Sequence, residues 1–349
     1  MSRRTVCVSF GHLHSFDAGL GEFAFRLGRG LVERRAVLRQ HGLDLAFHLQ
    51  PHLVGKLGDN VAYVHYARRQ ELLSWNLEGC ALWHSAFQHN ITRPPKEAAK
   101  RMLTIHDLNY LYANRGPGAW RDEFRTRLAV ARSRELVCIT NYVARDVQKN
   151  LAGRRPISVV YNGATDLTNV EQCPVEELEG LKFMFHMSRM APSKNVESLL
   201  NLARAWPDRT FVFAGPEWGH SLVLRDQLSG KLPNVKFMLG VSEGTKAWLL
   251  AHCEAFMFPS LAEGFGLPPI EAMYFGTPVF LSNRTCLPEI GGDRVAYFGS
   301  FDAQAMRQVV ERELPRLQAA RALTKERAAS FSWDACVDSY MGLYLKALA

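Results

Sequence analysis

One segment of the sequence, residues 259–273 (PSLAEGFGLPPIEAM), combines carboxylates, glycines and prolines in an order that suits ligand binding. It follows the apolar run 255–258, which we expect to be a buried strand, and Pro269 fits the first turn of a helix. Glycines let backbone amides approach a ligand closely, and a helix start attracts anions. We therefore expect Glu263 and Glu271 to point into one cleft at the carboxyl end of this strand.

Each of these carboxylates also has a structural interpretation. Glu271 is expected in the first turn of the helix, where a carboxylate can satisfy free amides. Glu263 stands as an unpaired carboxylate between apolar and glycine residues, where its clearest use is to bind hydroxyl groups. The sequence leaves capping open for Glu271 and favours ligand binding for Glu263.

Two cations follow the apolar run 183–187. Arg189 and Lys194 lie between this expected strand and a helix over about 195–205. Guanidinium and ammonium groups beside helix-end amides are suited to a diphosphate. Either residue taken alone is more simply a solvated surface charge, so the assignment needs both.

The first half of the chain offers a glycine turn. Gly19 and Gly21 open an expected helix over 22–35. Their flexibility would let the backbone approach a phosphate, although a Gly-x-Gly pair by itself more often marks only a turn.

Histidines lie at several expected strand ends of the same half. His106 follows the expected strand 102–105, so it faces the cleft at the carboxyl edge of the sheet. Asp107 either orients His106 or caps the next turn. His12 and His84 lie near other strand ends and are weaker candidates for the same edge.

These residues require elements that place them at strand ends, and the chain has the necessary alternation. Short β-rich runs alternate with longer segments of helical period, which is typical of parallel sheets with crossover helices. The polar, acidic stretch 162–180 is the expected linker between two such sheets, and 332–348 is an expected terminal helix with one apolar face. Strands are expected at 5–10, 43–49, 61–66, 81–83, 102–105, 136–139, 158–161, 183–187, 210–214, 235–239, 255–258, 278–281 and 296–298.

Length and composition fit this α/β organisation. The chain has 349 residues, of which 47% are hydrophobic and 22% charged, so disorder is excluded and two domains are expected. No apolar stretch approaches the roughly 18 residues of a membrane-spanning helix. The chain runs directly into the strand 5–10 without a signal-peptide core, and its seven cysteines are scattered without a Cys-x-x-Cys pair. We expect a cytoplasmic protein with reduced thiols.

Charge is unevenly distributed along the chain. Residues 1–160 hold 24 Lys and Arg against 13 Asp and Glu, a net +11, whereas 161–349 hold 18 against 21, a net −3. The basic half has no recognisable module for reading DNA or RNA, so we expect no nucleic-acid partner. We expect an anionic membrane surface as the partner, with an acidic soluble acceptor or a merely solvated helix face as the alternatives. Two helix-like segments carry the pattern, with arginines 26, 29, 34, 35 and 39 beside Phe23, Leu27 and Leu31, and arginines 121, 125, 127, 132 and 134 beside Trp120, Phe124 and Leu128.

A long motif resembles that of a known family. EGFGLPPIEAMYFGTPVFLSN at 263–283, followed by LPEIGGD at 287–293, resembles the signature of family 4 retaining glycosyltransferases, which have the GT-B architecture. Ser188 stands where the family usually has glycine. The resemblance covers nearly the whole chain, strongly after residue 180 and loosely before it. Further matches occur in order at Gly19 to Gly21, His106-Asp107-Leu108, Tyr161-Asn162-Gly163, HMSRMAPSKN (186–195), Gly215-Pro216 and Phe331-Ser332-Trp333.

The resemblance implies a domain organisation and substrates. Two Rossmann-like domains would face each other across a cleft, with residues 1–163 binding the acceptor, 164–331 binding a nucleotide diphosphate sugar, and the helix 332–349 packing back on the first domain. The chain would move a hexose, mannose or glucose, from a GDP- or UDP-linked donor to a lipid-linked or lipopolysaccharide-type glycan at the inner face of the cell membrane.

The resemblance also implies roles for the site residues. Catalytic residues would be His106, Arg189, Lys194 and Glu263, with the two cations stabilising the departing diphosphate. Asp107, His12 and His84 would lie on the acceptor side. The donor would be held by Gly19, Gly21, Gly264, Phe265, Gly266 and Glu271, with Glu271 on the ribose.

No cofactor or metal is expected. The chain contains no Asp-x-Asp, P-loop or His-Glu-x-x-His pattern, which favours cationic side chains over a metal as the diphosphate partner. The alternatives are a nucleotide-sugar epimerase or a phosphorylase on the same fold, or a non-catalytic basic binding protein.

Overall fold

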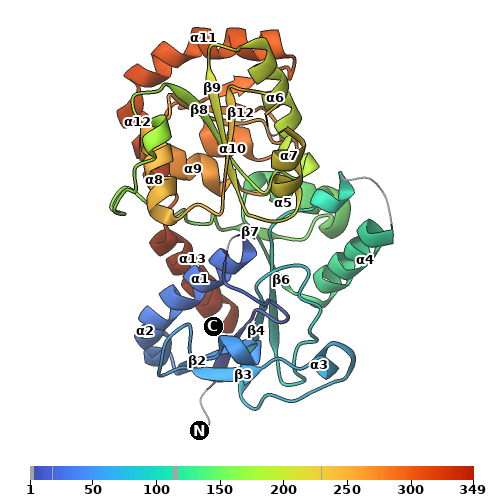
Figure 1. Cartoon of the computed structure of the whole chain (residues 1–349). Helices are drawn as coiled ribbons and strands as arrows, with labels where there is room; N and C mark the ends of the chain where they lie inside the picture. The colour runs from blue at the N-terminus through green and yellow to red at the C-terminus, as the bar shows by residue number, and fades with distance from the viewer. Residues whose placement is uncertain (1–3, 18, 113–116, 229) are drawn as a thin grey trace. The chain divides into compact units, whose positions relative to one another are not determined.

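The computed structural model describes residues 4–17, 19–112, 117–228 and 230–349. The chain forms two compact units, the first made of Met1–Gly163 with Ser332–Ala349 and the second of Ala164–Phe331. Figure 1 shows both units, each with strands at its centre and helices around them. Within the part of the chain that the structure describes, no helix is both long and apolar enough to cross a membrane.

The first unit is built on a seven-stranded sheet in the order β3-β2-β1-β4-β5-β6-β7, with all neighbours parallel. Its central strands are largely apolar, as is typical of parallel strands that helices cover on both faces. The strands are β1 (Arg4–Ser9), β2 (Leu43–Leu49), β3 (Ala62–His65), β4 (Cys80–Ser85), β5 (Lys100–Ile105), β6 (Glu135–Cys138) and β7 (Ile157–Val159).

The helices of the first unit include the chain's C-terminal helix. The hydroxyl of Ser332 caps that helix by accepting a hydrogen bond from the Ala335 amide at 3.1 Å. The helices are α1 (Leu20–Glu33), α2 (Arg35–Gln40), α3 (Arg69–Leu72), α4 (Pro117–Arg132), α5 (Asn141–Val147) and α13 (Trp333–Leu348), with short turns at Pro51–Leu53, Asn109–Leu111 and Gln148–Ala152.

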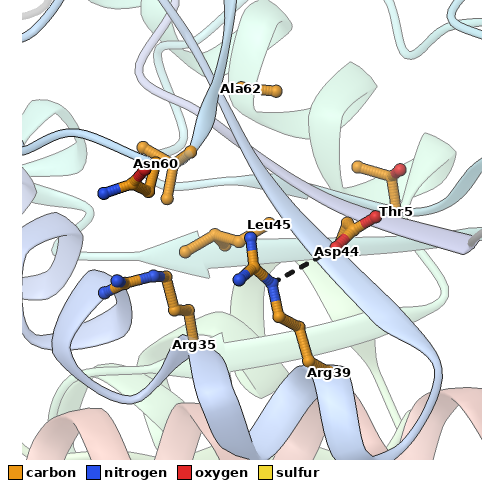
Figure 2. Close-up of a pocket in the computed structure, with 8 residues that line it drawn as sticks. Thr5, Arg35, Arg39, Asp44, Leu45, Asn60 and Ala62 are labelled. Carbon is orange, nitrogen blue, oxygen red and sulfur yellow. Dashed lines mark ion pairs between the residues drawn. The ribbon is translucent and has the colours of Figure 1, made fainter.

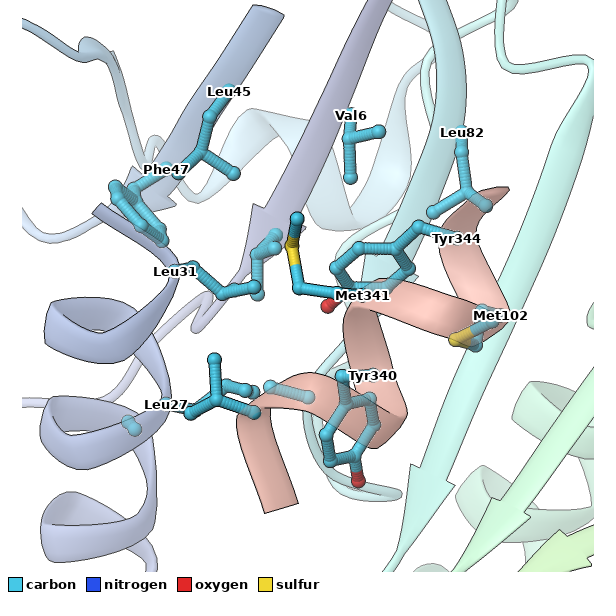
Figure 3. Close-up of a cluster of buried hydrophobic side chains, with 14 of the residues drawn as sticks. Val6, Leu27, Leu31, Leu45, Phe47, Leu82, Met102, Tyr340, Met341 and Tyr344 are labelled. Carbon is cyan, nitrogen blue, oxygen red and sulfur yellow. The ribbon is translucent and has the colours of Figure 1, made fainter. Parts of the chain in front are cut away.

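Helices α1 and α13 come from opposite ends of the chain and pack together on the sheet (Figure 3). A Cβ atom on Gly30 of α1 would lie 2.5 Å from Val337 Cγ2 of α13, so glycine permits this close approach. Phe23, Leu27 and Leu31 of α1 are buried in the same core. These three side chains therefore do not form part of a membrane-facing surface, contrary to the expectation from sequence.

The second unit contains a six-stranded parallel sheet in the order β10-β9-β8-β11-β12-β13. Its strands are β8 (Phe183–Met187), β9 (Thr210–Gly215), β10 (Val235–Leu239), β11 (Ala255–Phe258), β12 (Val279–Ser282) and β13 (Ala296–Phe298). Its helices are α6 (Val196–Ala205), α7 (His220–Leu228), α8 (Glu243–His252), α9 (Leu267–Tyr274), α10 (Leu287–Gly291), α11 (Ala303–Ala319) and α12 (Arg321–Ala329), with short turns at Glu176–Leu178 and Pro192–Lys194.

The α/β class with two parallel sheets is confirmed. The boundary between the two units, at Gly163 and Ala164, falls within the expected linker 162–180. Most of this stretch is nevertheless no free linker, because Leu167 and Leu178 are buried in the second unit and the Cys173 amide donates to the Gly244 carbonyl at 3.1 Å. The helix expected at 22–35 begins at Leu20 and breaks at Arg34, after which α2 follows.

Candidate functional site

In the second unit the candidate residues lie where the strand order changes direction. Strands β8 and β11 are parallel neighbours at the centre of the sheet. After β8 the chain continues to β9, toward one edge of the sheet, and after β11 it continues to β12, toward the other edge. Ligands in open α/β sheets bind at such a point. The two loops that follow these strands are joined, since Leu261 N–H donates to the Ser193 carbonyl at 2.7 Å and Ser260 Oγ does so at 3.0 Å.

Lys194 and Glu263 face each other across these joined loops. Lys194 Nζ lies 2.5 Å from Glu263 Oε1, and the two side chains are only 14% and 11% exposed. The ammonium also lies 5.7 Å from the ring centroid of Phe258, at the end of β11. Glu263 is therefore not the unpaired carboxylate that we expected. The pair places a cationic donor and an anionic acceptor at one point of the strand edge.

The Glu263 loop is held from behind by residues 285 and 286. Glu263 N–H donates to Thr285 Oγ1 at 3.2 Å, and Cys286 Sγ lies 3.3 Å from the Glu263 carbonyl and 3.2 Å from the Phe265 carbonyl. Burial raises the pKa of the Cys286 thiol well above its usual value, so the sulfur keeps its proton and donates. These contacts fix the loop that carries Gly264 and Gly266. Sequence reasoning treated Cys286 only as a buried thiol.

The start of α9 matches the expected binding loop with one correction. Gly266 immediately precedes the helix and has φ of +100°, a conformation that suits glycine. Phe265 is 5% exposed and packs edge-on against Phe331 at 5.7 Å, so its side chain belongs to the core. Only the backbone of Phe265 is available for a ligand.

Glu271 is the fifth residue of α9, beyond the first turn in which we placed it. Its Oε1 lies 2.7 Å from Lys246 Nζ on α8, and the Glu271 side chain is 4% exposed. The contact with Lys246 opposes the capping interpretation. Lys246 was missed because a single lysine in a helix gives no sequence signal.

Arg189 differs from Lys194 in its surroundings. It is exposed after β8, and within the described residues it forms no hydrogen bond or ion pair. Its guanidinium is therefore available to an anion, and its removal leaves no buried charge behind.

Ser188, which replaces the glycine of the resembling family, has an internal role. Its hydroxyl lies 2.7 Å from His186 Nε2 and accepts from the Met190 amide at 2.9 Å. His186 Nδ1 donates to the Met257 carbonyl at 2.8 Å, so Nε2 is the acceptor for Ser188. Burial lowers the pKa of His186 to about 4, which keeps the ring neutral. The extra side chain is thus satisfied inside the second unit.

In the first unit, His106 lies at the carboxyl end of β5 and is 6% exposed. Its Nε2 lies 2.9 Å from the Ala86 carbonyl, and because a carbonyl only accepts, Nε2 carries the proton. Burial lowers the pKa of His106 to about 4, so the ring is neutral and Nδ1 is an acceptor. Phe23 fixes the ring edge-on at 4.6 Å.

For Asp107, the contact of its carboxylate matches the capping interpretation. Asp107 Oδ1 accepts from the Asn109 amide at 3.0 Å at the start of the turn Asn109–Leu111. The Asp107 carbonyl accepts from Gln88 Nε2 at 3.0 Å.

His84 is a core residue and does not lie on an acceptor surface. It is fully buried within β4, which extends to Ser85, with Nδ1 2.7 Å from the Tyr344 hydroxyl and Nε2 2.8 Å from Thr104 Oγ1. Burial lowers its pKa to about 3. Both ring nitrogens are occupied, so the expectation for His84 is wrong.

His12 keeps its candidacy. It follows β1, lies edge-on to Phe87 at 6.0 Å, and has a pKa lowered chiefly by burial. Its Nδ1 is buried and has no hydrogen-bond partner among residues 4–17, 19–112, 117–228 and 230–349.

The two glycines before α1 have different surroundings. Gly19 has φ of +54°, and a Cβ there would meet nothing within 4 Å. At Gly21 a Cβ would lie 2.6 Å from the Ser15 carbonyl, so the lack of a side chain serves internal packing. Of these two glycines, Gly19 is the one that borders open space.

A separate cavity of about 320 Å³ lies at the amino ends of the first-unit strands (Figure 2). Thr5, Asp44 and Ala62 line it from the strands, and Arg35 and Arg39 line it from α2. Arg39 Nε lies 3.6 Å from Asp44 Oδ1, so one of the two arginines that line this cavity already faces a carboxylate. This edge is opposite to the one that carries His12 and His106.

Comparisons with known proteins identify a family match within the second unit and similar folds among solved structures. The family "Glycosyl transferases group 1" matches residues 172–318. The chain is 32% identical over 166 residues to the serotype-specific mannosyltransferase WbdA of Escherichia coli, covering 44% of this chain and 20% of that protein. It is 27% identical over 216 residues to the O-antigen chain mannosyltransferase B of Escherichia coli, covering 60% and 53%. The chain thus spans from a fifth to about half of the length of these relatives.

Solved structures extend the similarity of fold to the whole chain. Sucrose-phosphate synthase from Thermosynechococcus elongatus matches with a TM-score of 0.72 and 16% identity over 99% of both chains. A glycosyltransferase from Rickettsia africae matches with a TM-score of 0.69 and 14% identity over 100% of this chain and 99% of that one. The chain therefore contains a glycosyl transferases group 1 domain and has the α/β fold of the GT-B glycosyltransferases.

Proposed function

We propose that the chain is a retaining hexosyltransferase that moves mannose or glucose from a GDP- or UDP-linked donor to a glycan acceptor carried by lipid or lipopolysaccharide. The observation that carries the proposal is the Lys194–Glu263 pair at the β8–β11 switch point, inside the group 1 domain. The second unit would bind the donor and the first unit the acceptor. Similarity to O-antigen mannosyltransferases supports a hexose as the transferred sugar and a glycan as the acceptor.

The proposed reaction breaks the bond between the anomeric carbon and the diphosphate oxygen while the acceptor oxygen bonds to the same face of the sugar. The acceptor's proton passes to the leaving diphosphate, so the configuration is retained without a carboxylate nucleophile. Lys194 and Arg189 stabilise the charge that develops on the diphosphate. This stereochemistry follows the resemblance to family 4, and the two cations supply its electrostatic support.

The remaining residues hold the donor in this proposal. Glu263 accepts hydrogen bonds from hydroxyl groups of the hexose, beside the backbone of the loop 264–266. Glu271 binds the ribose, and Lys246 holds its carboxylate in place. The Gly19 backbone approaches the diphosphate. Neutral His106 accepts a hydrogen bond from a sugar hydroxyl at Nδ1. No metal takes part.

The proposed location is peripheral, on the anionic cytoplasmic face of the membrane. The support comes from α4, where Trp120 and Phe124 are 69% and 67% exposed and lie four residues apart on one face. The side chain of Arg121, the next residue after Trp120, is 63% exposed, and its Nε lies 3.7 Å from Asp122 Oδ1. Exposed aromatic groups together with a cation suit a lipid interface.

A panel of nucleoside diphosphate sugars tests the proposed activity. A donor at about 100 times its Kd stabilises the folded state by about 2.7 kcal/mol, which a melting experiment detects. The donor so identified should release free nucleoside diphosphate only when a glycan acceptor is present. Release without acceptor, interconversion of donors, or use of inorganic phosphate as acceptor would instead indicate a hydrolase, an epimerase or a phosphorylase. Failure of every donor to shift the melting temperature would favour a non-catalytic binding protein.

A further inference from the structure

A small cavity in the first unit lies between α4 and the segment that follows β4. Asn90 and Thr92 line it from the segment after β4, Arg125 and Arg132 line it from α4, and Ser85 at the end of β4 also contributes to its wall. Its volume is about 40 Å³. A single water needs about 10–15 Å³, so the cavity holds a group of a few atoms but not a sugar ring.

The cavity is strongly positive. Arg125 and Arg132 lie seven residues apart on α4, so they share one face of the helix. The pKa of Arg132 is lowered by burial and by the nearby charges of Arg93 and Arg101. None of these four arginines forms an ion pair with a carboxylate in the described part of the chain. Arg127, on the same helix, does pair with Glu123, at 2.8 Å.

Within the part of the chain that the structure describes, a buried hydroxyl without a partner belongs to Thr92, one of the residues that line the cavity. Thr92 is 3% exposed, and its buried Oγ1 has no hydrogen-bond partner among the described residues. The position of Thr92 is fixed by Asn90, whose Nδ2 donates to the Ser9 carbonyl at 3.1 Å and whose Oδ1 lies 3.3 Å from the Thr92 amide. A buried hydroxyl left unpaired is unfavourable, so a ligand whose binding turns this hydroxyl toward an acceptor oxygen is favoured.

We propose that this cavity binds a phosphate group. Guanidinium groups are the preferred partners of phosphate because they donate two parallel hydrogen bonds and a full charge. A tetrahedral oxyanion has enough acceptor oxygens to meet Arg125, Arg132 and the Thr92 hydroxyl from different directions.

Assigning this phosphate to the glycan acceptor rests on the proposed function. Ser85 lies at the carboxyl end of β4, in the unit that would bind the acceptor. The acceptor class is then a phosphate-bearing glycan or glycolipid, in preference to a neutral oligosaccharide. Free inorganic phosphate presents the same chemistry, and the experiment separates the two sources.

Calorimetric titration with inorganic phosphate tests the cavity directly, without donor or acceptor. Arg132→Gln removes one charge-assisted contact and should weaken phosphate binding at least about tenfold. Thr92→Val keeps the shape of the side chain but removes the hydroxyl, and should weaken binding about fivefold. Arg134→Gln is the matched control, because Arg134 is exposed just beyond α4 and does not line the cavity. If Arg132→Gln does not fold, Arg125→Gln takes its place.

The donor site is a second possible phosphate site, so Lys194→Ala is titrated in parallel. Loss of binding in the cavity variants, with Lys194→Ala unchanged, supports the proposal. Loss in Lys194→Ala alone, or no binding by the wild type at tens of millimolar phosphate, overturns it.

Transfer kinetics then identify the source of the phosphate. With a phosphorylated acceptor, Arg132→Gln should have an acceptor KM about tenfold higher than that of the wild type. With the same acceptor after phosphatase treatment, the variant and the wild type should have the same KM. Equal effects on both acceptors would overturn the assignment to the acceptor. If the wild type transfers to neither, the proposed function fails, and the phosphate titration still decides whether the cavity binds the anion.

Discussion

The ammonium of Lys194 and the carboxylate of Glu263 lie 2.5 Å apart although 69 residues separate them in the chain. They come from loops that follow neighbouring parallel strands, and both side chains are largely shielded from water. Removing one partner from such a pair leaves the other charge uncompensated. Activity and stability therefore depend on the same contact.

Lys194→Ala should lose turnover and stability together. Loss of one charge-assisted contact to a developing diphosphate costs about 3 kcal/mol of transition-state stabilisation, or roughly 100-fold in kcat. The carboxylate of Glu263 left behind should also lower the Tm. Steady-state kinetics and thermal melting measure the two effects, and near-wild-type turnover would contradict the site assignment.

Two controls separate the effects. The double variant Lys194→Met with Glu263→Gln has no unpaired charge, so it should recover most of the Tm but none of the activity. Arg189→Ala should also lose roughly 100-fold in kcat, and it should keep the wild-type Tm because Arg189 is exposed and within the described residues pairs with nothing.

Glu271→Ala should raise the KM for the donor more than it lowers kcat. Ribose contacts are made in the ground state as well as in the transition state, so their loss weakens both. Lys246→Met should have the same effect to a smaller degree, because Lys246 acts by holding Glu271 at 2.7 Å. A variant of Glu271 with unchanged KM and strongly reduced kcat would place this carboxylate at the reacting centre instead.

Much of the fold was readable from the sequence because most strands are short, largely apolar runs between polar turns. The strands at 43–49, 183–187, 235–239 and 255–258 were predicted with the bounds that the structure shows. The polar loops after β8 and β11 were also placed correctly. The contacts were not predictable, because Lys194–Glu263 joins two loops 69 positions apart and Lys246–Glu271 joins two helices, and neither contact has a local sequence signal.

His84 shows how a small error in an element changes a functional assignment. The predicted strand ended at residue 83, which put His84 in a loop at the strand edge. In the structure β4 continues to Ser85, so the ring lies inside the sheet, between Thr104 and Tyr344. The same limit applies to α1, whose apolar stripe fits a core as well as a membrane, and only its packing against α13 decides.

Chelation of divalent metal should leave hexose transfer nearly unchanged. The proposed charge partners of the diphosphate are Lys194 and Arg189, and side-chain cations cannot be removed by EDTA. Initial rates with and without EDTA measure the effect. Loss of activity that Mg²⁺ or Mn²⁺ restores would contradict the proposal of a metal-independent reaction.

Acid should destabilise the protein through buried neutral histidines. Burial lowers the pKa of His84 to about 3, whereas an unfolded histidine titrates near 6.5. As the pH falls below about 6.5 the unfolded state binds a proton that folded His84 does not, so the free energy of unfolding decreases by about 1.4 kcal/mol per pH unit. His48, His106 and His186, each with a pKa lowered to about 4, add to this dependence.

Urea denaturation between pH 7.5 and 4.5 measures this dependence. His84→Gln should show a lower midpoint at neutral pH, because the contacts with Thr104 and Tyr344 are altered, but a shallower loss of stability as the pH falls. His41→Gln, at an exposed position, is the control and should follow the wild type. An unchanged slope in His84→Gln would show that this residue does not contribute to the pH dependence.

The outer face of α4 should bind anionic vesicles. Trp120 and Phe124 are the exposed apolar groups of this face, and Arg121, which follows Trp120 in the chain, is 63% exposed. Arg125 and Arg132 line the small cavity instead. Burying a large apolar side chain contributes about 1.5–3 kcal/mol, and a cation near an anionic surface about 1 kcal/mol. The double variant Trp120→Ser with Phe124→Ser should therefore weaken vesicle binding at least about tenfold.

Co-sedimentation with phosphatidylglycerol vesicles at low and high salt measures this binding. Arg121→Glu should weaken binding at low salt and matter less at high salt, because the Debye length falls from roughly 30 Å at 0.01 M to about 3 Å at 1 M. Val223→Ser, which removes an exposed apolar side chain on α7 of the second unit, is the control and should bind as the wild type does. If the wild type remains in the supernatant at low salt, α4 is not a membrane surface, and its aromatic residues must contact the acceptor or simply face water.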